Sequence, residues 1–209
     1  MGSSEVGSSP GAPPGISQVT DADADRVTDL FALAFYDDPT WSWAFPDPDQ
    51  RVDQHRSLWV LFLHSALPHG WVWMTDDGGA ASLWIPPGEP ELSDADEARL
   101  EPLICELVGS HADEVMALFE RFDANHPRHE PHFYLSLLGT HPDQRGQGKG
   151  IGLLAANLAA IDDRRLPAYL ESSNRANGHR YERLGFVGIG EFAAPGDGPT
   201  VGCMWRDSR

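Results

Sequence analysis

Apolar residues recur along this chain at spacings that predict strands alternating with helices. Residues 16–20 can form a first strand, and residues 21–36 have Asp early and apolar side chains at every third or fourth position, as in a helix. Residues 37–48 are rich in aromatic residues and proline and are interpreted as a loop, and residues 52–67 return to helical periodicity. The pattern therefore predicts one strand followed by two helices.

A hairpin and a helical insertion are predicted next. Residues 71–75 and 80–85 are apolar and are separated by Asp76-Asp77-Gly78-Gly79, a run of turn-forming residues. Residues 93–122 have helical periodicity that is interrupted near Gly109-Ser110, which predicts one or two helices. Strands and helices are thus mixed along the chain, which indicates the α/β class.

A glycine-rich segment lies between two later apolar runs, residues 133–138 and 167–172, each suited to a buried strand. Residues 141–154 read H-P-D-Q-R-G-Q-G-K-G-I-G-L-L, so alternating glycines precede an apolar helical run. Glycine adopts backbone angles closed to other residues, so consecutive N–H groups can turn toward one anion. The unpaired amides of a helix start add to this attraction. The segment predicts a phosphate-binding loop that opens a helix.

Two common phosphate-binding loops do not fit this segment. A Walker loop needs Ser or Thr after its lysine to bind magnesium, but Lys149 is followed by Gly150. A dinucleotide fingerprint has the spacing G-x-G-x-x-G, whereas the glycines here occupy every second position from Gly146 to Gly152. The spacing does match Q/R-x-x-G-x-G/A, with Arg145 as its first residue; a frame shifted by two residues also fits.

This loop and its flanks resemble the GCN5-related N-acetyltransferases. An apolar strand precedes the loop, Asn174 follows the next strand, and residues 181–186 read Y-E-R-L-G-F, as at the end of that family's last helix. The resemblance covers residues 16–206, and its specific motifs lie in the last third. It implies a mixed, mostly antiparallel sheet of about seven strands flanked by helices and splayed between the fourth and fifth strands.

A narrower resemblance is to the actinobacterial branch of this family that includes puromycin N-acetyltransferase. It rests on P-D-x-x-x-G-x-G-x-G after a strand, on Trp84 followed by Pro86, and on a C-terminal strand ending in Cys203-Met204. We expect one acetyltransferase domain over residues 16–209. Residues 1–15 are rich in Gly, Ser and Pro and are expected to form a disordered tail.

The amino-acid composition limits the classes of molecule that this protein is expected to bind. The net charge is -17, with 15 Lys and Arg against 32 Asp and Glu, which argues against a nucleic-acid partner. An acidic surface would attract a cationic amine, but solubility is its more common explanation. No apolar run is long enough to predict a membrane span, and no export signal is recognised. Cys105 and Cys203 are expected to be reduced. A cytoplasmic protein is expected, with no membrane partner, and a homodimer is left open.

The resemblance implies acetyl-CoA as acyl donor and no metal. The residues that would contact the donor are those of the loop, the fourth strand and the residue after the fifth: Leu137, Leu138, Arg145, Gly146, Gln147, Gly148, Lys149, Gly150 and Asn174. Tyr181 matches a phenol that protonates the departing thiolate in many family members; packing against the core is its alternative. The general base is interpreted as Glu171 or His132, although Glu171 could instead be a paired carboxylate.

Three histidines form the main rival signal. His126, His129 and His132 are spaced by three, and a zinc ion bound by imidazoles could activate water. Pro127 and Pro131 interrupt the segment, however, so a rigid helical metal site is disfavoured, and we expect His126 to line the acceptor pocket instead. Tyr36 and Trp84 are the other expected acceptor contacts, since the first helix and third strand border the acceptor groove in the family.

The predicted function is direct transfer of an acetyl group from acetyl-CoA to an amine of a small molecule. An antibiotic or aminonucleoside is one such acceptor, given the branch resemblance. Two alternatives remain: acetylation of protein N-termini or lysines, which the insertion over residues 93–122 disfavours, and a non-catalytic module that senses acetyl-CoA.

Overall fold

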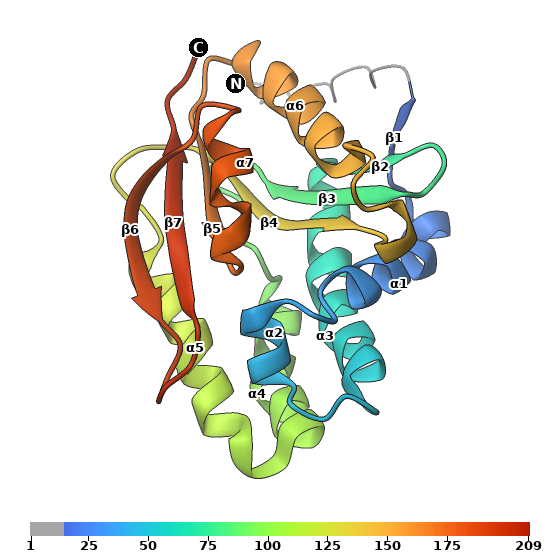
Figure 1. Cartoon of the computed structure of the whole chain (residues 1–209), viewed down its shortest axis with the longest axis vertical. Coiled ribbons are helices and arrows are strands. Elements are labelled where there is room, and N and C mark those ends of the chain that lie inside the picture. The colour runs from blue at the N-terminus through green and yellow to red at the C-terminus, as the bar shows by residue number, and fades with distance from the viewer. Residues whose placement is uncertain (1–14) are drawn as a thin grey trace, which may run out of the picture.

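The computed structural model describes residues 15–209, whose strands form one seven-stranded sheet in the order β1-β2-β3-β4-β5-β7-β6 (Figure 1). The strands are β1 (Ile16–Gln18), β2 (Val72–Thr75), β3 (Ala80–Ile85), β4 (Phe133–Thr140), β5 (Ala168–Ser172), β6 (Val187–Ala193) and β7 (Thr200–Arg206). β4 and β5 run parallel, and the other neighbouring pairs are antiparallel. The predicted α/β class and mixed sheet are confirmed. Of the tail expected over residues 1–15, all but Gly15 lies outside the described residues.

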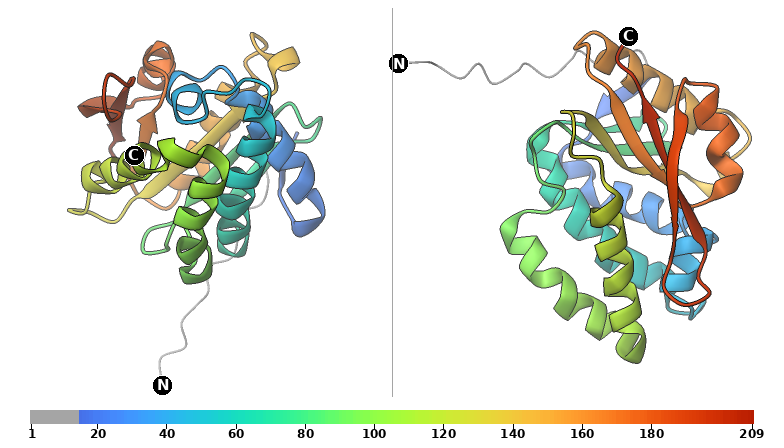
Figure 2. Two further views of the ribbon diagram at one scale, coloured as in Figure 1. Left: turned by 90° about the horizontal axis from the view of Figure 1, so that it is seen from below. Right: turned by 90° about the vertical axis from the view of Figure 1, so that its left-hand side faces the viewer.

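Helices cover both faces of the sheet. The α-helices are α1 (Ala24–Ala34), α2 (Pro39–Ala44), α3 (Arg51–Ala66), α4 (Asp94–Val108), α5 (Ala112–Asn125), α6 (Lys149–Asp162) and α7 (Gly178–Glu182). Short 3-10 helices are η1 (Asp21–Asp23), η2 (Leu67–His69), η3 (Gly109–His111), η4 (Pro142–Gln144) and η5 (Arg175–Asn177). α6 packs on β2 to β4, α1 and α3 pack on β3, and α4 and α5 form an outer pair beside α3 (Figure 2). Within the described residues, no helix has both the length and the apolar character needed to cross a membrane.

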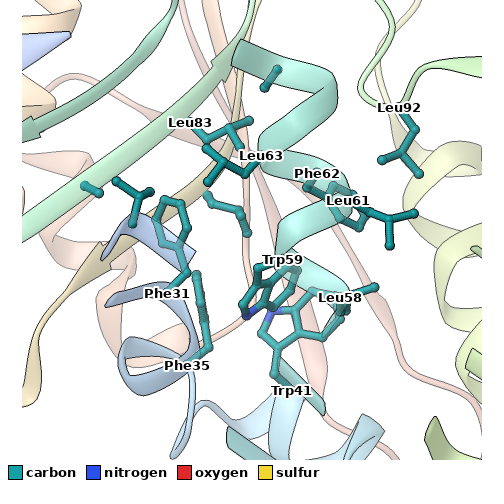
Figure 3. Packing of buried hydrophobic residues seen from close by; sticks show 14 of the residues in the cluster. Phe31, Phe35, Trp41, Leu58, Trp59, Leu61, Phe62, Leu63, Leu83 and Leu92 are labelled. Carbon is teal, nitrogen blue, oxygen red and sulfur yellow. The ribbon is translucent and has the colours of Figure 1, made fainter. Parts of the chain in front are cut away.

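The alternation of side chains along β3 decides which core each residue joins. Leu83 and Ile85 belong to the cluster with α1 and α3, part of which Figure 3 shows around Phe31 and Trp59. Trp84 points to the opposite face, because successive strand residues alternate, and belongs to the cluster with α6. The sheet therefore separates two cores, and the hollows described below adjoin the one under α1 and α3.

The segment expected to be a loop, residues 37–48, contains α2, which corrects the prediction. Asp38 caps this helix, since its carboxylate accepts hydrogen bonds from the amides of Thr40 at 3.0 Å and Trp41 at 3.2 Å. Pro39 occupies the first helical position, where its fixed φ and missing N–H are tolerated. The Asp-Pro pair was thus a helix start signal that the aromatic composition obscured.

The predicted insertion is confirmed as the two helices α4 and α5. They are separated by η3, and Gly109 has a φ of 55°, a left-handed conformation that suits glycine. The predicted hairpin of β2 and β3 is likewise present.

Two irregularities shape β4. Its register with β3 shifts between Leu83 and Trp84, which pair with Leu137 and Leu135, so Ser136 is an extra residue without a partner. Its parallel pairing with β5 ends at Leu135 and Leu170, although β4 continues to Thr140. The two strands therefore separate beyond this point. This separation is the predicted splay between the fourth and fifth strands.

Candidate functional site

The glycine loop connects β4 to α6. Gly146 and Gly148 have φ angles of 79° and 77°, which other residues rarely adopt, so both glycines are required by the path of the loop. The first helical amide that reaches a backbone carbonyl is that of Gly152, which donates to Gly148 at 2.8 Å. The amides before it lack partners within the helix, as at any helix start, and are available to an anion.

The loop borders a cleft of about 680 Å³, here called the loop cleft. Four of the 15 Lys and Arg residues of this acidic chain line it: Arg145, Lys149, Arg180 and Arg183. Two acidic residues, Asp37 and Asp38, also lie in its wall. A basic lining, helix amides and left-handed glycines together fit a ligand with several phosphate groups, such as CoA. Arg145 and Lys149 were predicted from the sequence, whereas Arg180 of α7 and Arg183 in the turn after it were not.

Arg145 and Lys149 are held in place by neighbouring segments. The Arg145 guanidinium donates to the Ala34 carbonyl at 2.8 Å. The Lys149 ammonium donates to Asp77 at 2.5 Å and to Gln144 at 2.6 Å, and the bond from Lys149 is the main reason that the pKa of Asp77 falls to about 2. Gln147, which was expected to contact the donor, does not line the cleft.

Gly150 is predicted to be intolerant of a side chain, and Gly152 to be tolerant. A Cβ on Gly150 would lie 2.4 Å from the Thr140 hydroxyl, whereas a Cβ on Gly152 would meet nothing within 4 Å. We expect Gly150→Ala to lower the free energy of unfolding by about 1–3 kcal/mol through overpacking. Gly152→Ala, in an exposed helical position, should raise it by about 0.5–1 kcal/mol. Urea denaturation of both variants checks this, and equal effects would contradict it.

Asn174, Leu138 and Tyr181 line the cleft beyond the loop. The Asn174 carboxamide oxygen caps η5 by accepting from the Ala176 amide at 3.0 Å, so its NH₂ is the group left for a ligand. Leu138 lies on β4 after its pairing with β5 has ended. An extended ligand arm that entered the splay would therefore meet β4 backbone that β5 does not occupy.

A second hollow, the inner pocket, adjoins the loop cleft. Its volume is about 70 Å³, and it shares Phe35, Leu138, Ser173 and Tyr181 with the cleft. Aromatic side chains form half of its remaining wall, including those of Trp41 and Trp59, whose ring centroids lie 4.6 Å apart in an edge-to-face arrangement (Figure 3). Leu137 also lines it.

A third hollow, the outer basin, adjoins the inner pocket on a different side. Its volume is about 720 Å³. The two share six residues: Phe62, Glu91, Phe119, Phe122, Tyr134 and Glu171. The loop cleft, inner pocket and outer basin therefore lie in series, and two ligands could meet in the inner pocket after entering from different sides.

Glu171 is a buried carboxyl group in the wall of the inner pocket. Its side chain is 2% exposed, and neither carboxylate oxygen has a hydrogen-bond partner of standard geometry. Burial raises the pKa of Glu171 to about 8, opposed by the nearby phenols of Tyr134 and Tyr169 and reinforced by the charge of Glu91. A carboxyl group with this pKa can exchange a proton near neutral pH.

Glu91, which was not predicted from the sequence, is a second acid of the same pocket. Burial raises its pKa to about 7, a hydrogen bond with Ser136 opposes the rise, and the charge of Glu97 adds to it. Ser136 is the bulge residue of β4, so the irregularity in the strand supplies a partner for Glu91. This contact depends on the path of residues 86–92, which no local pattern predicts. The one available signal was Ser136, a serine within an apolar strand.

The three histidines lie at the outer basin. His132 Nδ1 lies 2.8 Å from the Glu130 carbonyl, so in the neutral imidazole this nitrogen carries the proton and Nε2 accepts. His126 Nε2, at 3.0 Å, must then donate to it, which leaves the lone pair of His126 Nδ1 facing Glu171 at 3.9 Å. Burial lowers the pKa of His132, and it lowers the pKa of His126 to about 4, so both are neutral.

The zinc alternative finds no support in the geometry. Within residues 15–209, no three or more His, Cys, Asp or Glu side chains are grouped so that they could hold a metal ion. His129 instead packs against the ring of Trp205 at 5.2 Å.

Tyr181 lies where the loop cleft and inner pocket meet. Burial raises its pKa to about 12, and the charge of Asp38 adds to the rise, so the phenol is a proton donor at neutral pH. Asp38 accepts from the Ser173 hydroxyl at 2.8 Å, and the Thr40 hydroxyl donates to the Ser173 carbonyl at 2.9 Å. These bonds join the start of α2 to the end of β5 beside Tyr181.

Of the three residues expected to contact the acceptor, only His126 lines one of the hollows. His126 lines the outer basin. Tyr36 lines none of the three hollows; its hydroxyl donates to the Pro48 carbonyl at 3.2 Å, and the Arg51 guanidinium lies over its ring. Trp84 is fully buried, and its indole N–H donates to Asn157 at 3.1 Å. The alternation of side chains along β3 places Trp84 on the α6 face, so it lines none of the three hollows.

Solved structures similar to this chain are acetyltransferases. A histone acetyltransferase HPA2 and related acetyltransferase from Corynebacterium glutamicum is 24% identical, with a TM-score of 0.67 over 94% of this chain and 97% of that chain. Arylalkylamine N-acetyltransferase 2 from Aedes aegypti is 14% identical, with a TM-score of 0.60 over 93% and 98%. A polyamine N-acetyltransferase from Drosophila melanogaster is 16% identical, with a TM-score of 0.58 over 92% and 98%. No model of a protein family matches the sequence. At these identities the likeness establishes a shared fold.

Proposed function

We propose that this chain, which has the fold of the GCN5-related N-acetyltransferases, transfers an acetyl group from acetyl-CoA to an amine of a small molecule. The observation that carries the proposal is the placement of Glu171 and Tyr181 in the wall of one inner pocket, between a basic cleft and a second opening. A proton acceptor and a proton donor are the two groups that acyl transfer from a thioester to an amine requires.

The loop cleft would hold the donor. Bound acetyl-CoA supplies the thioester carbonyl that the amine attacks. The loop amides that border the cleft and its four basic side chains would bind the phosphates; these amides belong to Gly146, Gly148, Lys149 and Gly150. Leu137, Leu138 and the Asn174 carboxamide would contact the pantetheine arm in the splay, which directs the thioester toward the inner pocket.

Glu171 is proposed as the general base. It lines the inner pocket, whereas His132 lines only the outer basin and its ring nitrogens already face Glu130 and His126. A buried carboxylate is a stronger base than a solvated one, because burial disfavours its charged form. His126 lies between Glu171 and the basin with 27% of its side chain exposed, so a proton taken from the amine has an outward route.

Tyr181 is proposed as the general acid. Its phenol stands at the junction through which the thioester sulfur must pass, and its raised pKa keeps it protonated. A phenol with a high pKa keeps its proton until a base forms beside it. The departing CoA thiolate is such a base, so Tyr181 would protonate it as it leaves.

The pH dependence of kcat/KM follows from Glu171. We expect kcat/KM to rise with pH and to level above about 8, since the base must be ionised and the pKa of Glu171 is about 8. The groups that face this carboxyl are Glu91, His126, Tyr134, Tyr169 and Cys203. Removing the charge of Glu91 should ease the ionisation of Glu171, so Glu91→Gln should move the midpoint of the kcat/KM profile to lower pH. A midpoint that stays in place or rises would contradict this coupling.

The function itself is tested by thiol release. Purified protein is mixed with acetyl-CoA and one acceptor at a time, drawn from amines, puromycin-like aminonucleosides, aminoglycosides and peptides. Release of free CoA is measured, and binding of acetyl-CoA is measured separately by calorimetry. Release with a small amine supports the proposal, and the branch resemblance makes the aminonucleosides the first antibiotics to test. Release only with peptides favours protein acetylation; tight binding without release favours a sensor; no binding overturns the assignment.

A further inference from the structure

The two ends of the series of hollows have opposite charge. Four Lys and Arg side chains line the loop cleft. Six carboxyl groups line the outer basin, those of Glu89, Glu91, Glu97, Asp123, Glu130 and Glu171, together with one arginine. That arginine, Arg128, is paired with Asp123 at 2.5 Å. The acceptor side is therefore strongly acidic.

Three of these carboxyl groups form a row from the surface to the reaction point. Glu97 is exposed and lines only the basin, Glu91 lines both basin and inner pocket, and Glu171 lines both and is buried. The charge of Glu97 acts on Glu91, and that of Glu91 acts on Glu171. Neighbours in the row are thus close enough to repel each other.

The row has no cationic partner within residues 15–209. No Lys or Arg of this part of the chain forms an ion pair with Glu91, Glu97 or Glu171. The one basic group near Glu171 is His126, which is neutral. Glu171 also has no hydrogen-bond partner of standard geometry, although its side chain is 2% exposed. A buried acceptor left unsatisfied costs free energy that a cationic ligand would recover.

We propose that the acceptor carries a second positive charge: its reacting amine lies against Glu171 in the inner pocket, and its other cationic group lies between Glu91 and Glu97 in the outer basin. This inference rests on the proposed acetyltransferase function and names its substrate class, a diamine or polyamine. The aromatic wall of the inner pocket suits the alkyl chain next to the reacting amine and would also stabilise a cation. The volume of the basin, about 720 Å³, leaves room for a long or branched remainder.

The direct test compares amines that differ only in the second charge. Thiol release is measured with 1,3-diaminopropane and 1,4-diaminobutane against n-propylamine and n-butylamine, and binding of each amine to the protein with CoA is measured by calorimetry. We expect kcat/KM to be about tenfold or more higher for the diamines, with the difference shrinking at high salt. Equal values for mono- and diamines would overturn the inference and leave the proposed function standing.

Variants locate the second charge. Glu97→Gln should reduce the preference for diamines about two- to fivefold, as for an exposed ion pair, and Glu91→Gln should reduce it further. Glu101→Gln is the matched control, because it removes the same charge from an exposed position of α4 that lines none of the hollows. An effect of Glu101→Gln as large as that of Glu97→Gln would overturn the placement.

Binding separates this inference from the function. If no amine releases thiol but diamines bind more tightly than monoamines and Glu97→Gln removes the difference, the acidic row is a diamine site and the acetyltransferase proposal fails. If neither release nor preferential binding occurs, both proposals fail.

Discussion

Glu171→Gln is expected to lower kcat/KM about 10²–10⁴-fold while acetyl-CoA binds as before. The amide cannot accept the proton of the amine, and loss of a general base costs this much in enzymes. Donor binding should persist because Glu171 lines the inner pocket and the basin, not the loop cleft. Single-turnover rates and calorimetric acetyl-CoA affinity measure the two effects separately.

The same substitution is expected to stabilise the protein at alkaline pH. Burial raises the pKa of Glu171 from an unfolded value near 4.5 to about 8, so the folded state holds a proton that the unfolded state has lost. Stability from this group is fully present below about pH 4.5 and disappears as the pH rises through about 8. At pH 9 the free energy of unfolding of Glu171→Gln should therefore be about 2–4 kcal/mol higher than that of the unaltered protein. At pH 4 the two free energies of unfolding should be nearly equal.

The combination of lower activity and higher stability identifies a strained functional group rather than a structural one. Glu191→Gln is the matched control: it removes a carboxylate from exposed β6 that pairs with Arg175 at 3.1 Å. It should leave both activity and the pH dependence of stability nearly unchanged. A Glu171→Gln variant that is less stable at pH 9 would show that the carboxylate has partners that hold it in place, and full activity would remove it as the base.

Tyr181→Phe is expected to lower kcat about 10²-fold or more with little change in the affinity for acetyl-CoA. The phenyl ring keeps the contact with Phe186, whose ring centroid lies 6.3 Å away, but the donor for the leaving thiolate is lost. The loss should shrink for a thioester whose thiol has a lower pKa, because a better leaving group needs less protonation. A merely structural tyrosine would give no such dependence.

Tyr36→Phe provides the comparison for Tyr181. Tyr36 is a partly exposed tyrosine that lines none of the hollows, and its hydroxyl donates only to the Pro48 carbonyl. Its substitution should cost a few tenths to about 1 kcal/mol of stability and leave turnover unchanged. Equal turnover in the Tyr181→Phe and unaltered proteins would remove the general-acid assignment.

The fold was predictable because its signals are local. Apolar runs marked β4 and β5, a run of Asp and Gly marked the turn of the β2–β3 hairpin, and Gly109 marked the break between α4 and α5. The glycine loop was also predictable, because left-handed conformations at Gly146 and Gly148 require glycine. The exception was α2, whose Asp-Pro start lay within a run of aromatic residues.

The acceptor side was much less predictable because it depends on contacts between distant segments. Glu91 meets Glu171 only through the path of the chain after β3, which no local pattern encodes. Trp84 was expected at the acceptor because of its strand, but a shift of one position along a strand reverses the face, and Leu83 and Ile85 take the other side. His126 was expected to line the acceptor pocket, and it lines the outer basin, but its hydrogen bond to His132 joins residues six positions apart and was not predicted.

The hydrogen bonds that tie Asp38 and Thr40 to Ser173 also have a consequence for synthesis on the ribosome. They connect positions 135 and 133 residues apart, so one side of the contact is made long before the other. A nascent chain that has released the glycine loop and α6 still lacks Ser173, Asn174 and Tyr181, which complete the wall of the loop cleft. Acetyl-CoA would therefore find no complete cleft until the chain has emerged as far as Arg183, the last residue of the cleft wall, and it would act as a stabilising ligand only after that step.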